Sequence, residues 1–384
     1  MFKKIVIGMV LCLAMNFYAN ANDNTNKICP LGKSYRVAIA QGGSYTDFQR
    51  VFKHMVKNLM LKGMIKEKEL PADYLFDEGD NYQNLVSLSS GSCIQFVKDG
   101  LYNAKWKAPL RHQIKEELTE RILKKKDIDM LWAFGTNAGL DFAKSELNIP
   151  VLVITPSDPE GAGIIGKGEY SNKENIHVQK EIGRFASELR MFRNIFNFRT
   201  LGTLVDDEGV NQNAQAYDVI KNFAHENNIK LKVCKGDITS ENLDKARLEY
   251  SRCILELAQD KDVEAVYLTV SKGPDMNSFF KQIRPLIENK IPTFSQSGIY
   301  EVKQGSLMAL SEDDMAESGQ FEANVVLEIL EGKKPHEISQ YYNSPLTLAI
   351  NLKTASLLDW KPPFEILVAV DTVFQNIETV SYDN

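Results

Sequence analysis

The stretch DMLWAFGTNAGLDFAKSELNIPVLVITPSDPEGAGII occupies positions 129–165, and it decides the fold. Met130–Phe134 and Ile149–Ile154 are short apolar runs bounded by turn residues, which is typical of strands buried on both faces. Between them, Gly135–Ala138 form a tight loop and Gly139–Leu147 have helical spacing. Parallel strands joined by a helix bring their polar loops to the same edge of the sheet. The stretch therefore predicts a βαβ unit with a ligand crevice at that edge.

The same alternation recurs along the 384-residue chain. Strand-like runs that end in polar turns alternate with helical patterns in two sets, one from residue 35 to 156 and the other from 201 to 297. These two sets of βα units predict an α/β protein of two Rossmann-like domains, with parallel sheets flanked by helices and facing each other. A strand at 306–310 with the helix at 316–331 could return to complete the first domain, and a strand at 347–351 the second.

Three shorter segments carry their own predictions. Tyr74–Phe76 has the composition of a strand. Residues 86–97 suggest a hairpin that turns at Ser89-Ser90-Gly91. Ile176–Phe196 reads as one helix.

The N-terminus has the features of a secretory signal. In Met1–Ala21, two lysines precede an apolar run that is too short for a comfortable membrane span, and Ala19-Asn20-Ala21 suits cleavage. Because the segment holds two lysines and no acid, its removal changes the net charge from −6 to −8. An acidic exported chain without a basic stripe is a poor candidate for nucleic-acid binding. We expect a soluble periplasmic protein.

Four cysteines follow the signal, and their spacing matches no zinc site. They are Cys29, Cys93, Cys234 and Cys253. An oxidising compartment permits two disulfides, and the domain division given below would pair Cys29 with Cys93 and Cys234 with Cys253. Four separate thiols are an equally open alternative.

Two sets of motifs carry a resemblance to a known family. The first set resembles the pattern GT-x-A … IPVV … SDPVGAGLV, and the second resembles LKGxKPxDLP … INLKTAKxLGLxIPPxLLxxADEVI. The residues of the first set are Gly135-Thr136-Asn137-Ala138, Ile149-Pro150-Val151 and Ser157–Gly163, and those of the second are Leu330–Pro335, Ile350–Ala355, Pro362-Pro363 and Asp371-Thr372-Val373. In this order, between about Lys33 and Glu378, they resemble the substrate-binding component of ABC importers, in the family with tryptophan- and tyrosine-binding members.

This resemblance implies a type I periplasmic-binding-protein fold, with three crossovers between two Rossmann-like lobes and the ligand in the cleft between them. It implies an N-terminal lobe of 33–156 plus 299–335 and a C-terminal lobe of 157–298 plus 336–384. Residues 77–108 form a longer segment than the family usually has, which leaves the second loop's contribution to the cleft open. Asp359-Trp360 and Val370-Asp371-Thr372 also depart from the pattern.

Polar loop residues suit an amino-acid-like ligand. Ser44, Thr136 and Asn137 stand at helix starts that suit a carboxylate, although plain helix capping explains each equally well. The candidates for the ligand's ammonium are three aspartates that would otherwise be turn residues: Asp158, Asp207 and Asp275.

Other loop residues complete the predicted ligand-binding set. Tyr45 and Phe294 could sandwich a flat side chain, with Phe294 as core the alternative. Gln41 stands in the loop that holds Ser44 and Tyr45, and Ser157 stands in the loop that holds Asp158. Gln296 directly follows the strand that holds Phe294.

The sequence offers little for catalysis. It has no G-x-S-x-G, no P-loop and no marked Cys–His pair. The five histidines lack metal-ligand spacing; they are His54, His112, His177, His225 and His336. We therefore expect no enzyme activity, no metal and no cofactor.

The prediction is a monomeric solute-binding component of an ABC importer. It would capture a small ligand, an aromatic or other amino acid, by lobe closure and deliver it to an ABC permease in the inner membrane. A sensing protein that signals to a membrane receptor is one alternative. A binder of a sugar- or nucleoside-like solute is another.

Overall fold

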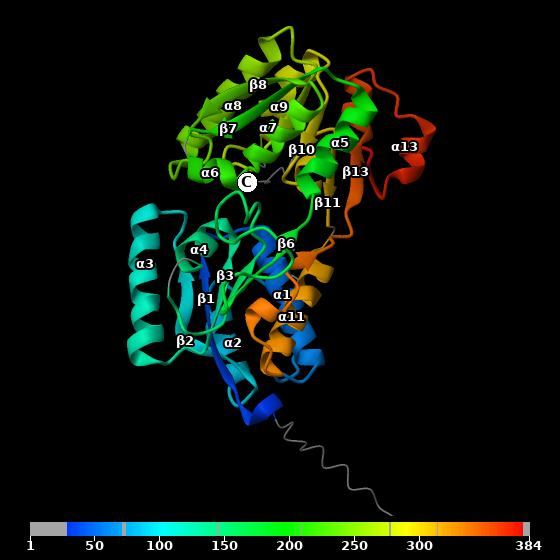
Figure 1. Ribbon diagram of the computed structural model, residues 1–384. Coiled ribbons are helices and arrows are strands. Elements are labelled where there is room, and N and C mark those ends of the chain that lie inside the picture. Colours follow the sequence, from blue (N-terminus) through cyan, green and yellow to red (C-terminus); the bar gives the residue numbers. More distant parts are fainter. Residues whose placement is uncertain are drawn as a thin grey trace, which may run out of the picture.

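The computed structural model describes residues 29–70, 74–143, 146–207, 209–275, 278–312 and 314–378. Figure 1 shows two lobes stacked end to end, each with its own sheet flanked by helices. The α/β architecture of two Rossmann-like lobes is therefore as the sequence predicted. The expected signal peptide, Met1–Ala21, lies outside the described residues.

The first lobe is built on a five-stranded sheet in the order β2-β1-β3-β4-β5, in which every neighbouring pair is parallel. Its strands are β1 (Tyr35–Gln41), β2 (Ile94–Asn103), β3 (Met130–Phe134), β4 (Val151–Ile154) and β5 (Ile176–Val178). Its helices are α1 (Thr46–Leu61), α2 (Asn81–Ser89), α3 (Ala108–Glu120), α4 (Gly135–Phe142) and α11 (Ala316–Leu330).

Alternate residues of β1 show why this sheet needs helices on both faces. Val37 and Ile39 belong to the core shared with α1 and α11, whereas Ala38 and Ala40 belong to the core shared with α3 and α4. Each large apolar side chain fully buried in this way contributes about 1.5–3 kcal/mol. The continuous apolar runs therefore place their strands between two helical layers.

Helix α11 returns from late in the sequence to lie on α1 (Figure 1). The two helices approach closely at Gly319, where a Cβ atom would lie 2.4 Å from the His54 Cβ. Glycine is therefore required at this position. Helix α11 completes the first lobe, as the sequence predicted.

The second lobe is built on a seven-stranded sheet in the order β14-β13-β11-β10-β9-β7-β8, with β13 antiparallel to β11. Its strands are β7 (Thr200–Asp206), β8 (Lys230–Gly236), β9 (Ala265–Leu268), β10 (Thr293–Ser295), β11 (Met308–Ser311), β13 (Thr347–Asn351) and β14 (Thr372–Phe374). Its helices are α5 (Arg184–Phe196), α6 (Gly209–Ala214), α7 (Tyr217–Glu226), α8 (Leu243–Gln259), α9 (Phe279–Glu288), α10 (Ile299–Lys303), α12 (Leu352–Leu357) and α13 (Phe364–Ala369).

Both lobes share one strand order. The order β2-β1-β3-β4-β5 of the first lobe is repeated as β8-β7-β9-β10-β11 in the second. In such doubly wound sheets, ligands bind beyond the carboxyl ends of the strands. The loops after the strands of both lobes are therefore the places for a shared site.

The chain crosses between the lobes three times: between β5 and α5, between β11 and α11, and between the short helical turn Pro335–Glu337 and β13. The first crossing contains β6 (Lys180–Glu181), and the third contains β12 (Tyr341–Tyr342). These two strands pair in parallel, so the first and third crossings lie side by side. The three predicted crossovers are present.

Two predicted lobe boundaries are displaced. Strand β5 pairs with β4, so residues 176–178 belong to the first sheet and not to the second lobe. Strand β11 pairs with β10 and β13, so residues 308–311 belong to the second sheet and not to the first lobe. Pairing between strands distant in sequence decides both positions.

Three local predictions are wrong. Residues 74–76 form a turn region in which Phe76 is buried, and not a strand. The expected hairpin over 86–97 is the end of α2 followed by β2, which pairs in parallel with β1. The expected helix over 176–196 is two short strands and α5. In each case, tertiary packing overrides the local pattern.

The structure pairs the cysteines within the lobes, as Cys29–Cys93 and Cys234–Cys253. The Cα–Cα distances are 5.3 and 5.4 Å, within the usual range for disulfides. The first disulfide fastens the N-terminal lead to the residue before β2, and the second fastens β8 to α8.

The loop lengths predict unequal stabilisation by the two disulfides. They close loops of 64 and 19 residues, for which loop-closure entropy gives about 4 and about 3 kcal/mol. We expect the C29A/C93A variant to lose more stability than the C234A/C253A variant, as measured by urea unfolding of the oxidised proteins. An equal loss, or the reverse order, would contradict this expectation.

Candidate functional site

A cavity of about 80 Å³ lies where the lobes and their crossings meet. One water needs about 10–15 Å³ by this measure, so the cavity has room for several. Residues from both lobes line it: Tyr45, Asp47, Phe48, Thr155, Pro156, Ser157, Gln179, Glu181, Arg184, Phe185, Val270, Gln296, Glu312, Met315, Ser318 and Tyr342. We call it the interlobe cavity.

The start of α1 supplies an aromatic wall of the cavity. The rings of Tyr45 and Phe48 meet edge to face with centroids 5.3 Å apart. Phe48 also packs over Gly135, where a Cβ atom would lie 2.4 Å from the ring. Because Gly135 has φ +80°, this turn favours glycine for its backbone as well. The G-T-N-A motif therefore shapes the aromatic wall and does not itself line the cavity.

Thr155, which follows β4, has an unusual backbone. Its φ is +51°, a left-handed conformation that is an outlier for a β-branched residue. Its N–H donates to Gln179 Oε1 at 2.9 Å. Its Oγ1 is buried and has no hydrogen-bond partner among the described residues. Such strain gathers at functional sites, and Thr155 is one of the residues that line the cavity.

The first crossing contributes an ion-pair cluster. Arg184 Nη1 donates to Glu181 at 3.1 Å, and its Nε donates to Glu188 at 2.9 Å. Tyr267 OH also donates to Glu188, which is fully buried. Burial raises the pKa of Glu188 to about 7, although Arg184 acts in the opposite direction. The charge of Arg184 is therefore already opposed by two carboxylates.

Glu312 connects the second crossing to its neighbours. One of its carboxylate oxygens accepts from Tyr342 OH at 2.6 Å, and the other accepts from the Ser318 N–H at 3.0 Å. Ser318 Oγ in turn accepts from Gln179 Nε2 at 2.8 Å. Burial raises the pKa of Glu312 above its ordinary value. Glu312 thus connects the second crossing directly to Tyr342 in the third and, through Ser318, to Gln179 in the first.

Three of the predicted ligand-binding residues line the interlobe cavity: Tyr45, Ser157 and Gln296. Gln296 is held in place because its Oε1 accepts from the Val270 N–H at 2.8 Å and its Nε2 donates to the Gln215 carbonyl at 3.1 Å.

Gln41 and Ser44 belong instead to a polar network around Asp77. Gln41 Nε2 and Ser44 Oγ each donate to Asp77 Oδ2 at 2.6 Å, and Asn103 Nδ2 donates there at 3.2 Å. Gln49 Nε2 donates to Asp77 Oδ1 at 2.7 Å. Asp77 and Asn103, both from the long 77–108 segment, thereby meet beside the β1 loop.

The remaining predicted residues do not line the interlobe cavity. Thr136 Oγ1 accepts from the Ser157 N–H, and Asn137 Oδ1 accepts from Arg111. Asp158 and Asp275 accept bonds from residues three positions on, as turn residues do. Asp207 is exposed.

For Phe294, which was a candidate for ligand contact with a core position as the alternative, the structure favours the core position. It is fully buried in the core of the second lobe, with its ring centroid 5.4 Å from Phe192 and 5.9 Å from Tyr267. Its strand lies in the middle of the sheet, where both faces are covered.

Sequence reasoning missed the charged residues of the cavity: Asp47, Glu181, Arg184 and Glu312. Asp47 stands two positions after Tyr45 and could have been found in that loop. Glu181 and Arg184 lay inside a predicted helix, and Glu312 inside a segment assigned to the wrong lobe. Locating the crossings correctly was the missing step.

The lobes touch each other outside the cavity. The guanidinium of Arg50 lies 4.4 Å from the ring centroid of Tyr300, and Lys272 Nζ lies 5.3 Å from that of Trp106. The Ala108 N–H donates to Glu241 Oε1 at 2.8 Å. Each contact joins the first lobe to the second.

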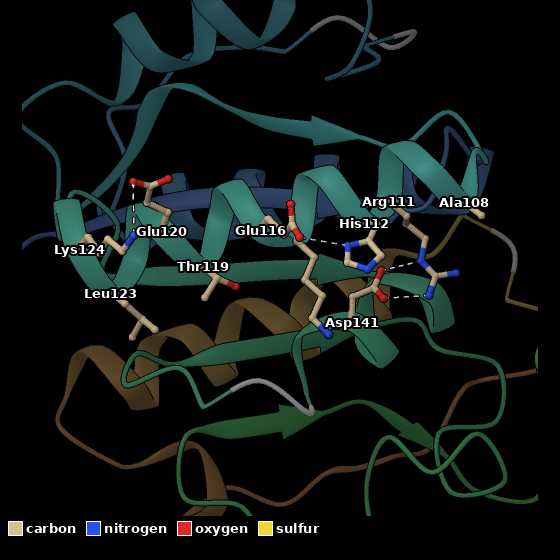
Figure 2. A pocket seen from close by; sticks show the side chains of 10 residues that line it. Ala108, Arg111, His112, Glu116, Thr119, Glu120, Leu123, Lys124 and Asp141 are labelled. Carbon is tan, nitrogen blue, oxygen red and sulfur yellow. Dashed lines mark hydrogen bonds and ion pairs between the residues drawn. The ribbon is translucent and has the colours of Figure 1, made fainter.

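A larger surface depression, of about 670 Å³, runs along α3 (Figure 2). Arg111 and Asp141 face each other across its end with two hydrogen bonds of 2.6 and 2.8 Å. His112 and Glu116 form an i,i+4 pair on the exposed helix face. These charges satisfy one another, and the second lobe contributes none of the lining residues.

No group of three or more His, Cys, Asp or Glu side chains among the described residues could hold a metal ion. No helix in the part of the chain that the structure describes is long and apolar enough to span a membrane.

Two lobes of like topology, three crossings and a cavity between them define a binding protein of the type I periplasmic fold. The sequence profile described as ABC transporter substrate binding protein matches residues 102–374, which is more than half of the chain. The chain belongs to this family. No curated protein sequence matches it.

Solved structures share the fold at low sequence identity. A conserved domain protein from Vibrio cholerae is 18% identical with a TM-score of 0.66, and the match covers 89% of this chain and 100% of that one. An ABC domain in complex with L-Trp from Streptococcus pneumonia is 15% identical, with a TM-score of 0.65 and the same coverage. A solute-binding protein from Agrobacterium vitis with bound allitol is 13% identical, with a TM-score of 0.52, covering 85% and 99%.

Glu301, in α10, predicts a pH dependence of stability. It is buried, it accepts from Ser295 Oγ at 2.6 Å, and burial raises its pKa from 4.5 to about 7. The folded protein holds this proton where the unfolded chain releases it, so the group's contribution to stability is present below pH 4.5 and is lost as pH rises through 7.

We therefore expect Glu301→Gln to gain stability relative to wild type as pH rises from 4.5 to above 7, by up to about 3 kcal/mol. Urea unfolding at pH 4.5, 6 and 8 measures the difference. Glu365→Gln, at an exposed position of α13, is the matched control and should follow wild type. Parallel pH profiles for E301Q and wild type would contradict the expectation.

Proposed function

We propose that this protein is the solute-binding component of an ABC importer. It captures a small ligand in the interlobe cavity and presents it to a permease in the inner membrane. The observation that carries the proposal is a cavity lined from both lobes at the crossings of a family member. The L-Trp complex of the Streptococcus relative supports a small ligand with an aromatic part.

Closure of the lobes supplies the mechanism. A ligand that touches Tyr45 and Ser157 on the first lobe and Gln296 on the second stabilises the arrangement in which the lobes meet. The crossings bend while the two sheets move as units. The proposed binding needs no cofactor and no chemical step, and the proposal includes a monomeric, non-enzymatic carrier in the periplasm.

A ligand screen tests the proposal. We expect at least one member of a panel of amino acids, amines, sugars and nucleosides to raise the melting temperature. At a hundred times the Kd, a ligand stabilises the folded state by about 2.7 kcal/mol. Mass spectrometry of small molecules released from denatured protein gives an independent reading. If no panel member shifts the melting temperature and no molecule is released, the binding function is wrong.

Trp106 predicts an optical signal of closure. It lies at the lobe interface beside Lys272, whereas Trp132 is fully buried in the first lobe. A ligand that the screen finds should change tryptophan emission in wild type. Trp106→Phe should remove most of that change while thermal-shift binding persists. An unaltered emission change in W106F would show that the signal arises away from this interface.

A further inference from the structure

The charges around the interlobe cavity are unbalanced. Three carboxylates line it, from Asp47, Glu181 and Glu312, whereas Arg184 is the only cation among the described lining residues. Arg184 is bonded to Glu181 and to Glu188, a fourth carboxylate behind the wall. A ligand carboxylate would therefore enter a site whose one positive charge is already more than neutralised.

Arg184 and Arg50 both act on the Asp47 carboxylate, as does a hydrogen bond from Tyr45. Arg50 Nη1 lies 3.9 Å from Asp47 Oδ1, at the limit of an ion pair, and Arg184 is bonded to Glu181 and Glu188. Arg50 also lies over the ring of Tyr300. Burial, with Glu181 nearby, raises the pKa of Asp47 although the two arginines act in the opposite direction.

Glu312 is in a similar position. Its partners, Tyr342 OH and the Ser318 N–H, are neutral donors, and burial raises its pKa. Glu181 lies close enough to Asp47 and to Glu312 to act on the pKa of both. A cation placed among these three groups would gain charge-assisted hydrogen bonds in a partly dry site.

The other walls suit the rest of such a molecule. Tyr45, Phe48, Phe185 and Tyr342 provide aromatic surface, which attracts both flat apolar groups and cations. Thr155, whose Oγ1 is buried and has no hydrogen-bond partner among the described residues, is another lining residue.

We propose that the interlobe cavity binds a small organic cation, an ammonium group joined to a flat or apolar body, with the ammonium among Asp47, Glu181 and Glu312. This inference rests on the proposed solute-binding function. It replaces Asp207 and Asp275 as the ammonium's partners, and it gives the ligand no carboxylate.

Matched probes that share one body and differ in charge test this inference. The first set is 2-phenylethylamine, phenylalanine, 3-phenylpropionate and 2-phenylethanol. The second set, with a smaller body, is butylamine, norvaline, pentanoate and butanol. Calorimetry with the full mature chain should give at least one amine that binds ten times more tightly than its amino-acid and alcohol counterparts, with no binding of the acids.

Variants locate the site. Asp47→Asn and Glu312→Gln should each weaken binding of the amine at least tenfold, whereas the control Asp207→Asn, at an exposed position outside the cavity, should leave it unchanged. Melting curves show whether each variant is folded. If D47N does not fold, Glu181→Gln takes its place with the same expectation.

The failures of the two proposals can be told apart. Tighter binding of an amino acid or acid than of its amine overturns the organic-cation inference and leaves the solute-binding function standing. Release of a natural ligand without a cationic group also overturns the inference, and so do equal effects of D47N and D207N on amine binding. Failure of both amines to bind also overturns the inference, while failure of every ligand in the wider panel overturns the function itself.

Discussion

The structure depends on the hydrogen bonding that holds three chain crossings together. Glu312 accepts from Tyr342 and from the Ser318 N–H, and β6 pairs with β12 beside it. A buried polar group left without its partner costs about 1–3 kcal/mol, so these bonds restrict where the crossings can lie. The position of the lobes, and of the cavity between them, follows from that restriction.

The residues that join the lobes also line the interlobe cavity. Gln179 bonds to Ser318 and to the backbone of Thr155, and all three line the interlobe cavity. A ligand that bonds to Glu312 or Thr155 therefore acts directly on the hinge. In the proposed function, binding and lobe closure would be coupled through these shared side chains.

The proposed ligand class follows from electrostatics that the fold creates. Taken one at a time, Asp47, Glu181 and Glu312 are ordinary acidic residues in loops and crossings. The fold brings them to one partly buried cavity that has a single arginine, which is already paired. There they favour a positively charged ligand. Asp207 was an equally good candidate in the sequence, but the β7 loop leaves it exposed to solvent.

The sequence by itself determined the α/β class, the alternation of strands and helices, and the likeness to ABC substrate-binding proteins. These depend on local apolar runs and short motifs such as Gly135-Thr136-Asn137-Ala138. Tertiary structure alone decided that β5 joins the first sheet, that β11 joins the second, and that Phe294 is core. It also decided which acidic residues meet. Pairing between distant strands and burial between lobes are long-range effects, and no local pattern along the chain carries them.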